Sequence, residues 1–502
     1  MDLFYMTTSP LKMTEKIIII GSGFSSISAG TYLADKGYDV TILEKNSSFG
    51  GRARKFKAEG FTFDMGPSWY WMPDVFEKYF NDFDKSVSDF YNLKKLDPAY
   101  RVYFGKNDYI EIEDSLEKIS ETFEKIEKGA SKNLLKFMAE AKNNYSVAME
   151  KVVYKPGKSI LELVTPGTIR RLRYFTTNIK SEVSRYFKNK KLRQIMEFPV
   201  LFLGAKPENT PAFYNIMNHA DLGLGTWFPE KGGMYKVVES MIKLAKEKGV
   251  NFKSDQNVDE IVVSNKRIKG VISNGKEFPA DIVISGADYN HTEKLIPKHL
   301  KNYDDSFWDK KVFAPSSLLF YIGLNKKVKK LPHHNLFFDV DFNKHASEIY
   351  DNPKWPESPL FYLNFPSLSD KSMAPDGCEN CFILIPIAPD LEDKEEIREK
   401  YLNIVLKRIE DISGEKISDN IIFKKSFCVK DFMDDYNSYK GNAYGLANTL
   451  FQTSIFKPKM KSKKIKGLYF TGQLTVPGPG VPPSLISGKI VSSEVIKDYP
   501  NQ

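Results

Sequence analysis

The chain has 502 residues, of which 41% are hydrophobic and 13% aromatic, and its formal net charge is +9 at pH 7. This length exceeds what one small core accommodates, so two or three domains are predicted. The modest positive charge permits attraction to anionic lipid, no nucleic-acid partner is predicted, and no apolar run reaches the length of a membrane-spanning helix.

A complete β-α-β unit is predicted close to the start of the chain. Residues 17–20 form a β-branched apolar run typical of a buried parallel strand, a helix is predicted over 27–35, and a second strand over 40–43. Glycines between the first strand and the helix permit a tight turn and the approach of a pyrophosphate to the helix N-terminus. An acid at the end of the second strand is expected to bond a ribose diol and to repel a 2′-phosphate, which disfavours NADP. The residues predicted to hold this dinucleotide are Gly21, Gly23, Phe24, Ser25, Ser26 and Glu44.

A second glycine-rich segment follows this unit and favours a longer ligand. Lys45 comes directly after the acid, and Gly50, Gly51 and Arg52 stand a few residues later. These residues suit a ligand whose pyrophosphate and ribityl chain run over exposed backbone, with the arginine near a phosphate, so they favour FAD over NAD. A strand predicted at 61–64 then ends in a rigid turn formed by Gly66, Pro67 and Ser68.

From residue 114 to about 193 the sequence is charge-rich and helical. Asp114 with Glu117 is interpreted as a capping box at the first of these helices. A basic helix with Leu, Tyr and Phe between its charges is predicted to lie on an anionic membrane surface, and a solvated basic face is the alternative. Its cations are Arg170, Arg171, Arg173, Lys180, Arg185, Lys188, Lys190, Lys191 and Arg193. Residues 198–203 then predict a buried strand or a tunnel wall.

The second half of the chain alternates strands with loops and ends in another glycine-rich turn. A helix is predicted up to Lys246, and a hairpin is predicted around Asn274-Gly275. Residues 467–489 read as a strand, a turn and a helix that Pro482 and Pro483 can start, so a flavin can meet backbone N–H groups there. Further strands are predicted at 251–255, 258–263, 280–287, 318–322, 336–338, 360–363 and 382–387.

Taken together, these motifs resemble the bacterial phytoene desaturases, a carotenoid desaturase family among the amine-oxidase-like flavoproteins. The resemblance spans about residues 16–497 and rests on the first turn, the acid followed by Gly-Gly-Arg, the FDMGPS turn and the C-terminal motif. It implies FAD as the cofactor and adds Val258, whose counterpart in relatives contacts the adenine through its backbone. At the flavin it implies Gly472, Gln473, Val481 and Pro482. Many relatives have histidine where Val476 stands, so no imidazole base is expected there, no catalytic residue is named, and no metal is predicted.

The resemblance also implies the architecture, an α/β fold with a Rossmann-like FAD-binding domain. A substrate domain of mixed sheet and a helical membrane-facing region are expected as insertions. Residues 14–105, 226–290 and 436–502 are assigned to the FAD-binding domain. Residues 106–225 are assigned to the helical insertion, and 291–435 to the sheet of the substrate domain.

The function implied is FAD-dependent desaturation of phytoene toward lycopene, with the hydride passing to flavin N5 and oxygen or a quinone as the final electron acceptor. The expected substrates are phytoene and downstream C40 carotenes. The first twelve residues lack a secretory signal, so the cytoplasmic membrane face is expected, and homo-oligomerisation is left open. The alternatives are a hydroxycarotenoid 3,4-desaturase, another polyene desaturase or saturase, an amine oxidase, and a non-catalytic flavin-binding protein.

Overall fold

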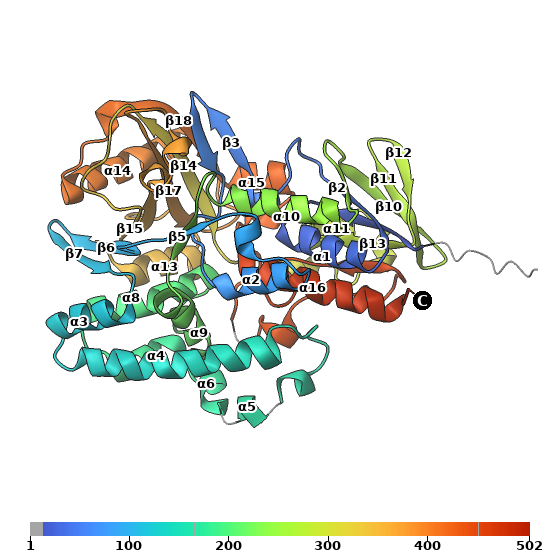
Figure 1. The fold of residues 1–502 in the computed structure, drawn as a ribbon, viewed down its shortest axis with the longest axis horizontal. Coiled ribbons are helices and arrows are strands. Elements are labelled where there is room, and N and C mark those ends of the chain that lie inside the picture. Colours follow the sequence, from blue (N-terminus) through green and yellow to red (C-terminus); the bar gives the residue numbers. More distant parts are fainter. Residues whose placement is uncertain (1–13, 165, 170, 450, 502) are drawn as a thin grey trace, which may run out of the picture.

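The computed structural model describes residues 14–164, 166–169, 171–449 and 451–501. One part of the molecule is built on a five-stranded parallel sheet with the strand order β19-β13-β1-β2-β9, on the right of Figure 1. Its strands are β1 (Lys16–Ile20), β2 (Asp39–Leu43), β9 (Asn251–Lys253), β13 (Ile282–Ser285) and β19 (Leu468–Phe470). Segments from the beginning, the middle and the end of the chain therefore form a single sheet.

The central strand of this sheet is buried on both faces, as its continuous apolar sequence predicts. Ile17 and Ile19 pack in the core that includes α1 (Phe24–Asp35), and α1 is flanked by α10 (Tyr235–Glu247) and α16 (Val481–Asp498). Ile18 and Ile20 pack on the opposite side, against an antiparallel three-stranded sheet. The strands of that sheet are β10 (Val258–Ser264), β11 (Arg267–Ser273) and β12 (Lys276–Pro279). The predicted hairpin at Asn274-Gly275 connects β11 to β12 and is confirmed.

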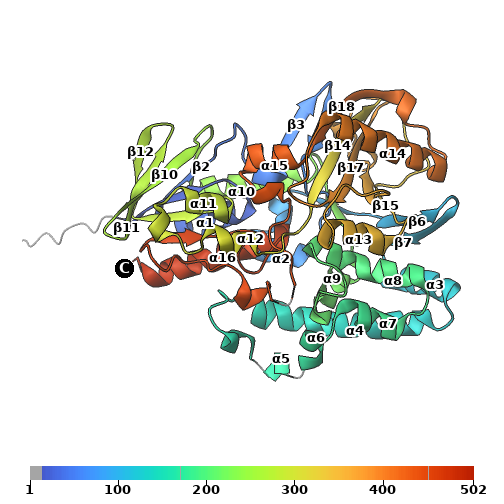
Figure 2. The same cartoon turned by 180° about the vertical axis from the view of Figure 1, so that it is seen from behind.

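A larger, mixed sheet forms the other part of the molecule, with the order β18-β14-β17-β16-β15-β6-β7. Its strands are β6 (Tyr100–Gly105), β7 (Asp108–Ile112), β14 (Ser316–Leu324), β15 (His334–Phe337), β16 (Phe361–Asn364), β17 (Glu379–Ile387) and β18 (Ile421–Phe427). Helix α14 (Glu395–Ser413) covers one face, as Figure 2 shows from behind. β6 pairs with β15 in this sheet, although it lies in the stretch 14–105 assigned to the FAD-binding domain. The domain boundaries stay a prediction.

A layer of helices lies below the larger sheet in Figure 1. Its helices are α3 (Leu116–Ile126), α4 (Ala130–Val147), α5 (Pro166–Ile169), α6 (Leu172–Thr176), α7 (Ile179–Tyr186), α8 (Lys190–Glu197) and α9 (Ile216–Asn218). Among the described residues, none of the helices combines the length and apolar character needed to cross a bilayer.

Three local predictions in this layer are wrong. The N-cap of α3 is Ser115, whose hydroxyl accepts from the Lys118 N–H, so Asp114 and Glu117 form no capping box. The basic stretch 170–193 contains three helices in place of one, because non-helical backbone at Thr177 and at Phe187 separates them. Residues 198–203 form a 3₁₀ helix and no strand.

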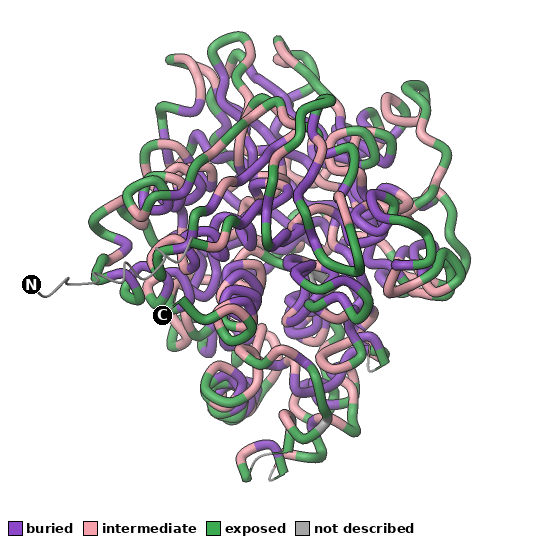
Figure 3. The backbone as a smooth tube through the Cα atoms, turned by 90° about the vertical axis from the view of Figure 1, so that its right-hand side faces the viewer, coloured by how far each residue is buried: buried purple, intermediate pink, exposed green. Residues whose placement is uncertain are grey.

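Shorter elements connect these layers. They are β3 (Lys55–Ala58), β4 (Phe61–Asp64), β5 (Leu93–Lys95), β8 (Trp227–Pro229), α2 (Pro73–Asn81), α11 (Tyr289–Lys294), α12 (Asp305–Asp309), α13 (Phe342–Tyr350) and α15 (Val429–Tyr436). Buried backbone concentrates where the two sheets meet their helices, and exposed backbone dominates the outer loops (Figure 3).

Candidate cofactor-binding site

The first glycine turn leaves open space at the N-terminus of α1. Gly21 has a φ of +84° and donates its N–H to the Leu43 carbonyl at 2.7 Å, which bends the chain sharply after β1. Gly23 is the N-cap of α1, and no described side chain caps this end. A Cβ atom at Gly23 would meet no described atom within 4 Å. Because the first N–H groups of a helix lack partners inside the helix, this space fits the anionic pyrophosphate of FAD.

Glu44 fastens this turn to the end of β2. Its Oε2 accepts from the Ser22 N–H at 2.9 Å and from the Ser22 hydroxyl at 2.7 Å. Its Oε1 accepts from the backbone and side-chain N–H groups of Asn46, both at 3.0 Å. The carboxylate is buried and oriented by four donors. A contact between this carboxylate and a ribose stays a prediction.

The second glycine pair passes directly across the first. The Gly50 N–H donates to the Ser22 carbonyl at 3.1 Å, and a Cβ at Gly51 would lie 3.2 Å from the Cα of Gly23. Gly66 is equally restricted, since its Cβ would lie 2.6 Å from the carbonyl oxygen of Arg52. Predicted residues from three separate motifs therefore meet around one turn, as a ligand extended over backbone requires.

The C-terminal motif joins this site through the crossing of α1 and α16. A Cβ at Gly488 would lie 2.4 Å from the Ser25 carbonyl oxygen, so the two helices touch through backbone. A Cβ at Gly472 would lie 3.1 Å from the Ser25 hydroxyl, and Gly472 donates its N–H to Ser487 at 3.0 Å. α16 begins at Val481 and Pro482 with no side-chain cap from the described residues. Residues from both sides of the α16 start, Gly472 and Gly488, therefore lie against Ser25 of the first turn.

Two predicted cations turn toward residues 434–438, none of which was predicted as a site residue. Lys45 donates to the carbonyl of Asp434 at 2.6 Å, a residue 389 positions away. Arg52 donates to the Ser438 hydroxyl at 2.9 Å, and its guanidinium lies 5.0 Å from the ring centre of Tyr436. Burial lowers the pKa of Arg52. Its Nε is buried and has no partner among the described residues, which leaves one donor for a bound anion.

The remaining predicted residues lie farther from the turn or meet it through neighbours. Val258 begins β10 in the core shared with Ile18, and the Gln256 N–H just before it donates to the Glu44 carbonyl at 2.8 Å. Gln473 directs its amide toward Asn442 at 3.5 Å. Pro67 leads to Ser68, which lines a small cavity with residues of the larger sheet. Ser68 therefore stands between the turn and that sheet.

An aromatic cluster lies between the larger sheet and the helical layer. Trp69 stacks on His334 with ring centres 4.1 Å apart, and it also contacts Tyr100 and Phe198 at 5.4 and 6.0 Å. The Tyr100 hydroxyl donates to the Asp221 carboxyl at 2.7 Å. Burial raises the pKa of Asp221 to about 8, so this acid is largely protonated at neutral pH. Residues 69–71 are all aromatic in the sequence, but no local pattern identifies His334 or Asp221 as their neighbours.

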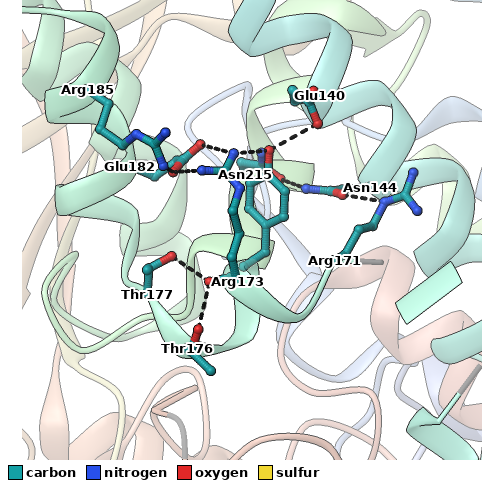
Figure 4. Close-up of polar contacts among 10 residues, drawn as sticks. Glu140, Asn144, Arg171, Arg173, Thr176, Thr177, Glu182, Arg185 and Asn215 are labelled. Atoms are coloured by element: carbon teal, nitrogen blue, oxygen red, sulfur yellow. Dashed lines mark hydrogen bonds and ion pairs between the residues drawn. The ribbon is translucent and has the colours of Figure 1, made fainter. Parts of the chain in front are cut away.

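The basic stretch is partly neutralised by its own neighbours (Figure 4). Arg173 and Arg185 both pair with Glu182, at 3.1 and 3.5 Å, and the Glu182 side chain is only 1% exposed. Arg171 donates to Asn144 at 2.8 Å, and Arg170 lies outside the described residues. The apolar residues nearby are exposed instead, and they are Leu161, Val164, Ile169 and Leu172, with Phe451 and Phe456 from a second segment.

The sequence and the fold were compared with known proteins. Residues 25–496 match the model of the family described as "Flavin containing amine oxidoreductase". The chain is 42% identical to a "Carotenoid 3,4-desaturase" of Haloarcula japonica, over 96% of this chain and 98% of that protein. It is 30% identical to a "zeta-carotene-forming phytoene desaturase" of Myxococcus xanthus, over 96% and 94%. Its fold resembles that of a Methanosarcina mazei oxidoreductase with a TM-score of 0.64 at 16% identity, over 95% and 100% of the two chains.

Proposed function

The chain belongs to the carotenoid desaturases of the flavin-containing amine oxidoreductase family, and we propose that it introduces the 3,4 double bond of a C40 carotenoid. One observation carries this choice of position: identity to the 3,4-desaturase is 42%, against 30% to the phytoene desaturase, over nearly the same length. Desaturation of phytoene toward lycopene is the second candidate, and that relative together with the FDMGPS and C-terminal motifs supports it.

FAD is the cofactor, and when bound it accepts a hydride equivalent from the substrate at N5. The turn at 21–26 suits its pyrophosphate, Glu44 its ribose, and the segment 472–482 its ring system. The uncapped start of α1 favours the negative charge of the phosphates. Gly51 packs closely on Gly23, which brings the backbone of the second glycine pair beside the space assigned to the pyrophosphate. These assignments are part of the proposal.

The polyene requires alignment and a dry surface more than polar catalysis. Trp69, Tyr100 and Phe198 form a closely packed aromatic cluster, an apolar environment that suits a hydrocarbon chain. Loss of the hydride leaves a cation whose charge spreads into the neighbouring double bonds. The adjacent carbon then loses a proton to a weak base such as water, which forms the new double bond, so a strong base is unnecessary. Oxygen or a quinone is proposed as the final electron acceptor, and reoxidation rates of the reduced protein with each will distinguish them.

We test the reaction by pigment analysis in two host strains that express this chain. One host accumulates phytoene, and the other accumulates a later carotenoid that lacks the 3,4 double bond. A product with one more conjugated double bond in the second host, with phytoene unchanged in the first, is expected. Lycopene in the first host would favour phytoene desaturation instead. No change in either host, with oxidation of an amine by the FAD-loaded protein, would contradict both carotenoid proposals.

We also propose that the protein contacts a membrane surface through apolar residues, with the basic residues in a supporting role. Leu161 and Phe451 are 74% and 72% exposed, an unusual position for large apolar side chains. Their segments lie together, since Lys459 donates to the Gly157 carbonyl at 2.6 Å and to the Ile455 carbonyl at 2.9 Å. A carotenoid substrate dissolves in the lipid bilayer, so the protein must contact the membrane to take it up. The expected location is the cytoplasmic face of the membrane.

A further inference from the structure

Two buried polar side chains near the C-terminal motif have atoms without partners among the described residues. Lys457 is 2% exposed, and its Nζ makes no hydrogen bond to any described residue. Asn448 is buried to the same degree, and its Oδ1 also has no partner. A buried lysine is almost always paired, because taking an amine out of water without a hydrogen bond costs several kcal/mol. A ligand group that satisfies both atoms would remove this cost.

Both side chains lie against the same residue of the glycine-rich turn. The position of a Cβ at Gly478 is 3.2 Å from Cε of Lys457 and 3.4 Å from Oδ1 of Asn448. Gly478 has a φ of +139° and stands between Gly472 and the start of α16 at Val481. The unpartnered amine and amide therefore border the turn to which we assign the flavin ring.

We propose that Lys457 and Asn448 bind the pyrimidine edge of the flavin ring. This edge presents a carbonyl oxygen beside an N–H, so it needs one donor and one acceptor side by side. The Lys457 amine donates to the ring carbonyl, and Asn448 Oδ1 accepts from the ring N–H. The assignment depends on the proposed placement of the flavin at 472–482, and it is independent of which polyene is desaturated.

A lysine at this place also affects the redox chemistry. Burial alone lowers the pKa of Lys457 to about 7, and no charged side chain contributes to this shift. The ring carries more negative charge after reduction, so a protonated Lys457 interacts more favourably with reduced than with oxidised flavin. The reduction potential of the bound FAD is therefore higher with Lys457 than without it.

The test uses the full FAD-loaded chain without any polyene, and it measures the two-electron reduction potential by equilibration with a reference dye. For Lys457→Met we expect a tenfold loss of preference for reduced over oxidised flavin, which lowers the potential by about 30 mV. Lys457→Gln keeps a donor but no charge, so it lowers the potential while FAD affinity is retained. Lys457→Arg restores the potential. For Asn448→Leu we expect about tenfold weaker FAD binding with a smaller change in potential.

Lys459→Met is the matched control, because Lys459 donates to the carbonyls of Gly157 and Ile455 and leaves Gly478 untouched. Its potential should equal that of the unmodified protein. A folded, FAD-loaded Lys457→Gln protein with an unchanged potential would overturn the proposal. So would variants that keep the potential and FAD affinity but lose discrimination for a hydroxylated polyene, since the pair would then bind a substrate hydroxyl. If Lys457→Met holds no flavin, the Gln and Arg variants still decide the question.

Discussion

Ser22 donates both its backbone N–H and its hydroxyl to one carboxylate oxygen of Glu44, at 2.9 and 2.7 Å. The first glycine turn and the end of β2 are therefore one hydrogen-bonded unit, already formed before a ribose arrives. Glu44 shapes the site in addition to any contact with the ligand. Its removal should affect the turn as well as the affinity for FAD.

The first prediction concerns Glu44→Ala. The substitution leaves buried N–H groups of Ser22 and Asn46 unpaired, at a cost of about 1–3 kcal/mol. We expect the FAD dissociation constant to rise about tenfold or more, measured by flavin fluorescence on titration of the apoprotein. Glu260→Ala, at an exposed position of β10, is the control. Unchanged affinity in Glu44→Ala would contradict the proposed role of this acid.

The second prediction separates ligand space from protein packing at Gly23. This residue has a φ of −70°, which alanine adopts without strain, and its Cβ would meet no described atom within 4 Å. Gly23→Ala should therefore unfold at the same temperature as the unmodified apoprotein or slightly higher. Its FAD affinity should fall about tenfold because the methyl group occupies the space assigned to the pyrophosphate. Full FAD affinity would show that the ligand lies elsewhere.

The third prediction concerns Gly488, where we expect a substitution to lower the stability of the apoprotein, in contrast to Gly23. A Cβ there would lie 2.4 Å from the Ser25 carbonyl oxygen and 2.6 Å from the Ser28 Cβ, so α1 and α16 must separate. We expect Gly488→Ala to lower the free energy of unfolding of the apoprotein by about 1–3 kcal/mol. Chemical denaturation followed by circular dichroism measures this change. Equal stability of the apoproteins of Gly488→Ala and Gly23→Ala would contradict the described helix crossing.

The fourth prediction concerns pH and Asp221. Burial raises the pKa of this carboxyl from 3.8 to about 8, so the folded state keeps a proton that the unfolded state loses. Its contribution to stability is therefore present below pH 3.8 and is lost as the pH rises through about 8. Asp221→Asn keeps an acceptor for Tyr100 and cannot ionise. Between about pH 5 and pH 9, the thermal midpoint of Asp221→Asn should therefore fall less than that of the unmodified protein.

Asp259→Asn, on the exposed side of β10, should follow the unmodified protein across the same pH range. A steeper loss of stability in Asp221→Asn than in either protein would mean that the carboxyl is charged in the folded state.

The fifth prediction tests the apolar membrane face by flotation with anionic vesicles. Leu161→Glu together with Leu172→Glu should abolish binding, because both side chains are exposed on the proposed contact surface. Leu135→Glu, at an exposed position of α4, should leave binding unchanged. Glu182→Gln should increase binding, since it releases Arg173 and Arg185 from their shared partner.

Loss of binding in the Leu135→Glu control would show that a negative charge anywhere on the helical layer is sufficient to prevent binding to anionic vesicles. Unchanged binding in the double variant would contradict an apolar membrane contact at Leu161 and Leu172.

Local sequence was sufficient where neighbouring residues determine the structure. The β1-α1-β2 unit follows from strand and helix periodicity around Gly21, and the β11-β12 hairpin follows from Asn274-Gly275, both of which adopt positive φ. These features need only a few adjacent residues, so a pattern in the chain identifies them.

Long-range partners could not be predicted in this way. Lys45 was predicted to contact the cofactor and Arg52 to lie near a phosphate, and both stay predictions. Their donations to the Asp434 carbonyl and the Ser438 hydroxyl could not be predicted, because no local signal connects segments so far apart. The same limit explains Phe198, where an apolar run predicted a strand. Phe198 packs against Trp69 and Tyr100 from a 3₁₀ helix. The apolar residue is therefore buried as expected, but its backbone is helical and not extended.

The order in which the parallel sheet is assembled has a consequence for biosynthesis. β1 and β2 leave the ribosome more than 400 residues before β19 and α16, although these elements belong to the same sheet and its helix layer. Before β19 and α16 are made, one edge of β13 is unpaired and the side of α1 that packs on α16 is uncovered. Such a state is prone to association with other chains. The cofactor-binding site is therefore complete only once α16 has been translated, and we expect FAD to bind after that point.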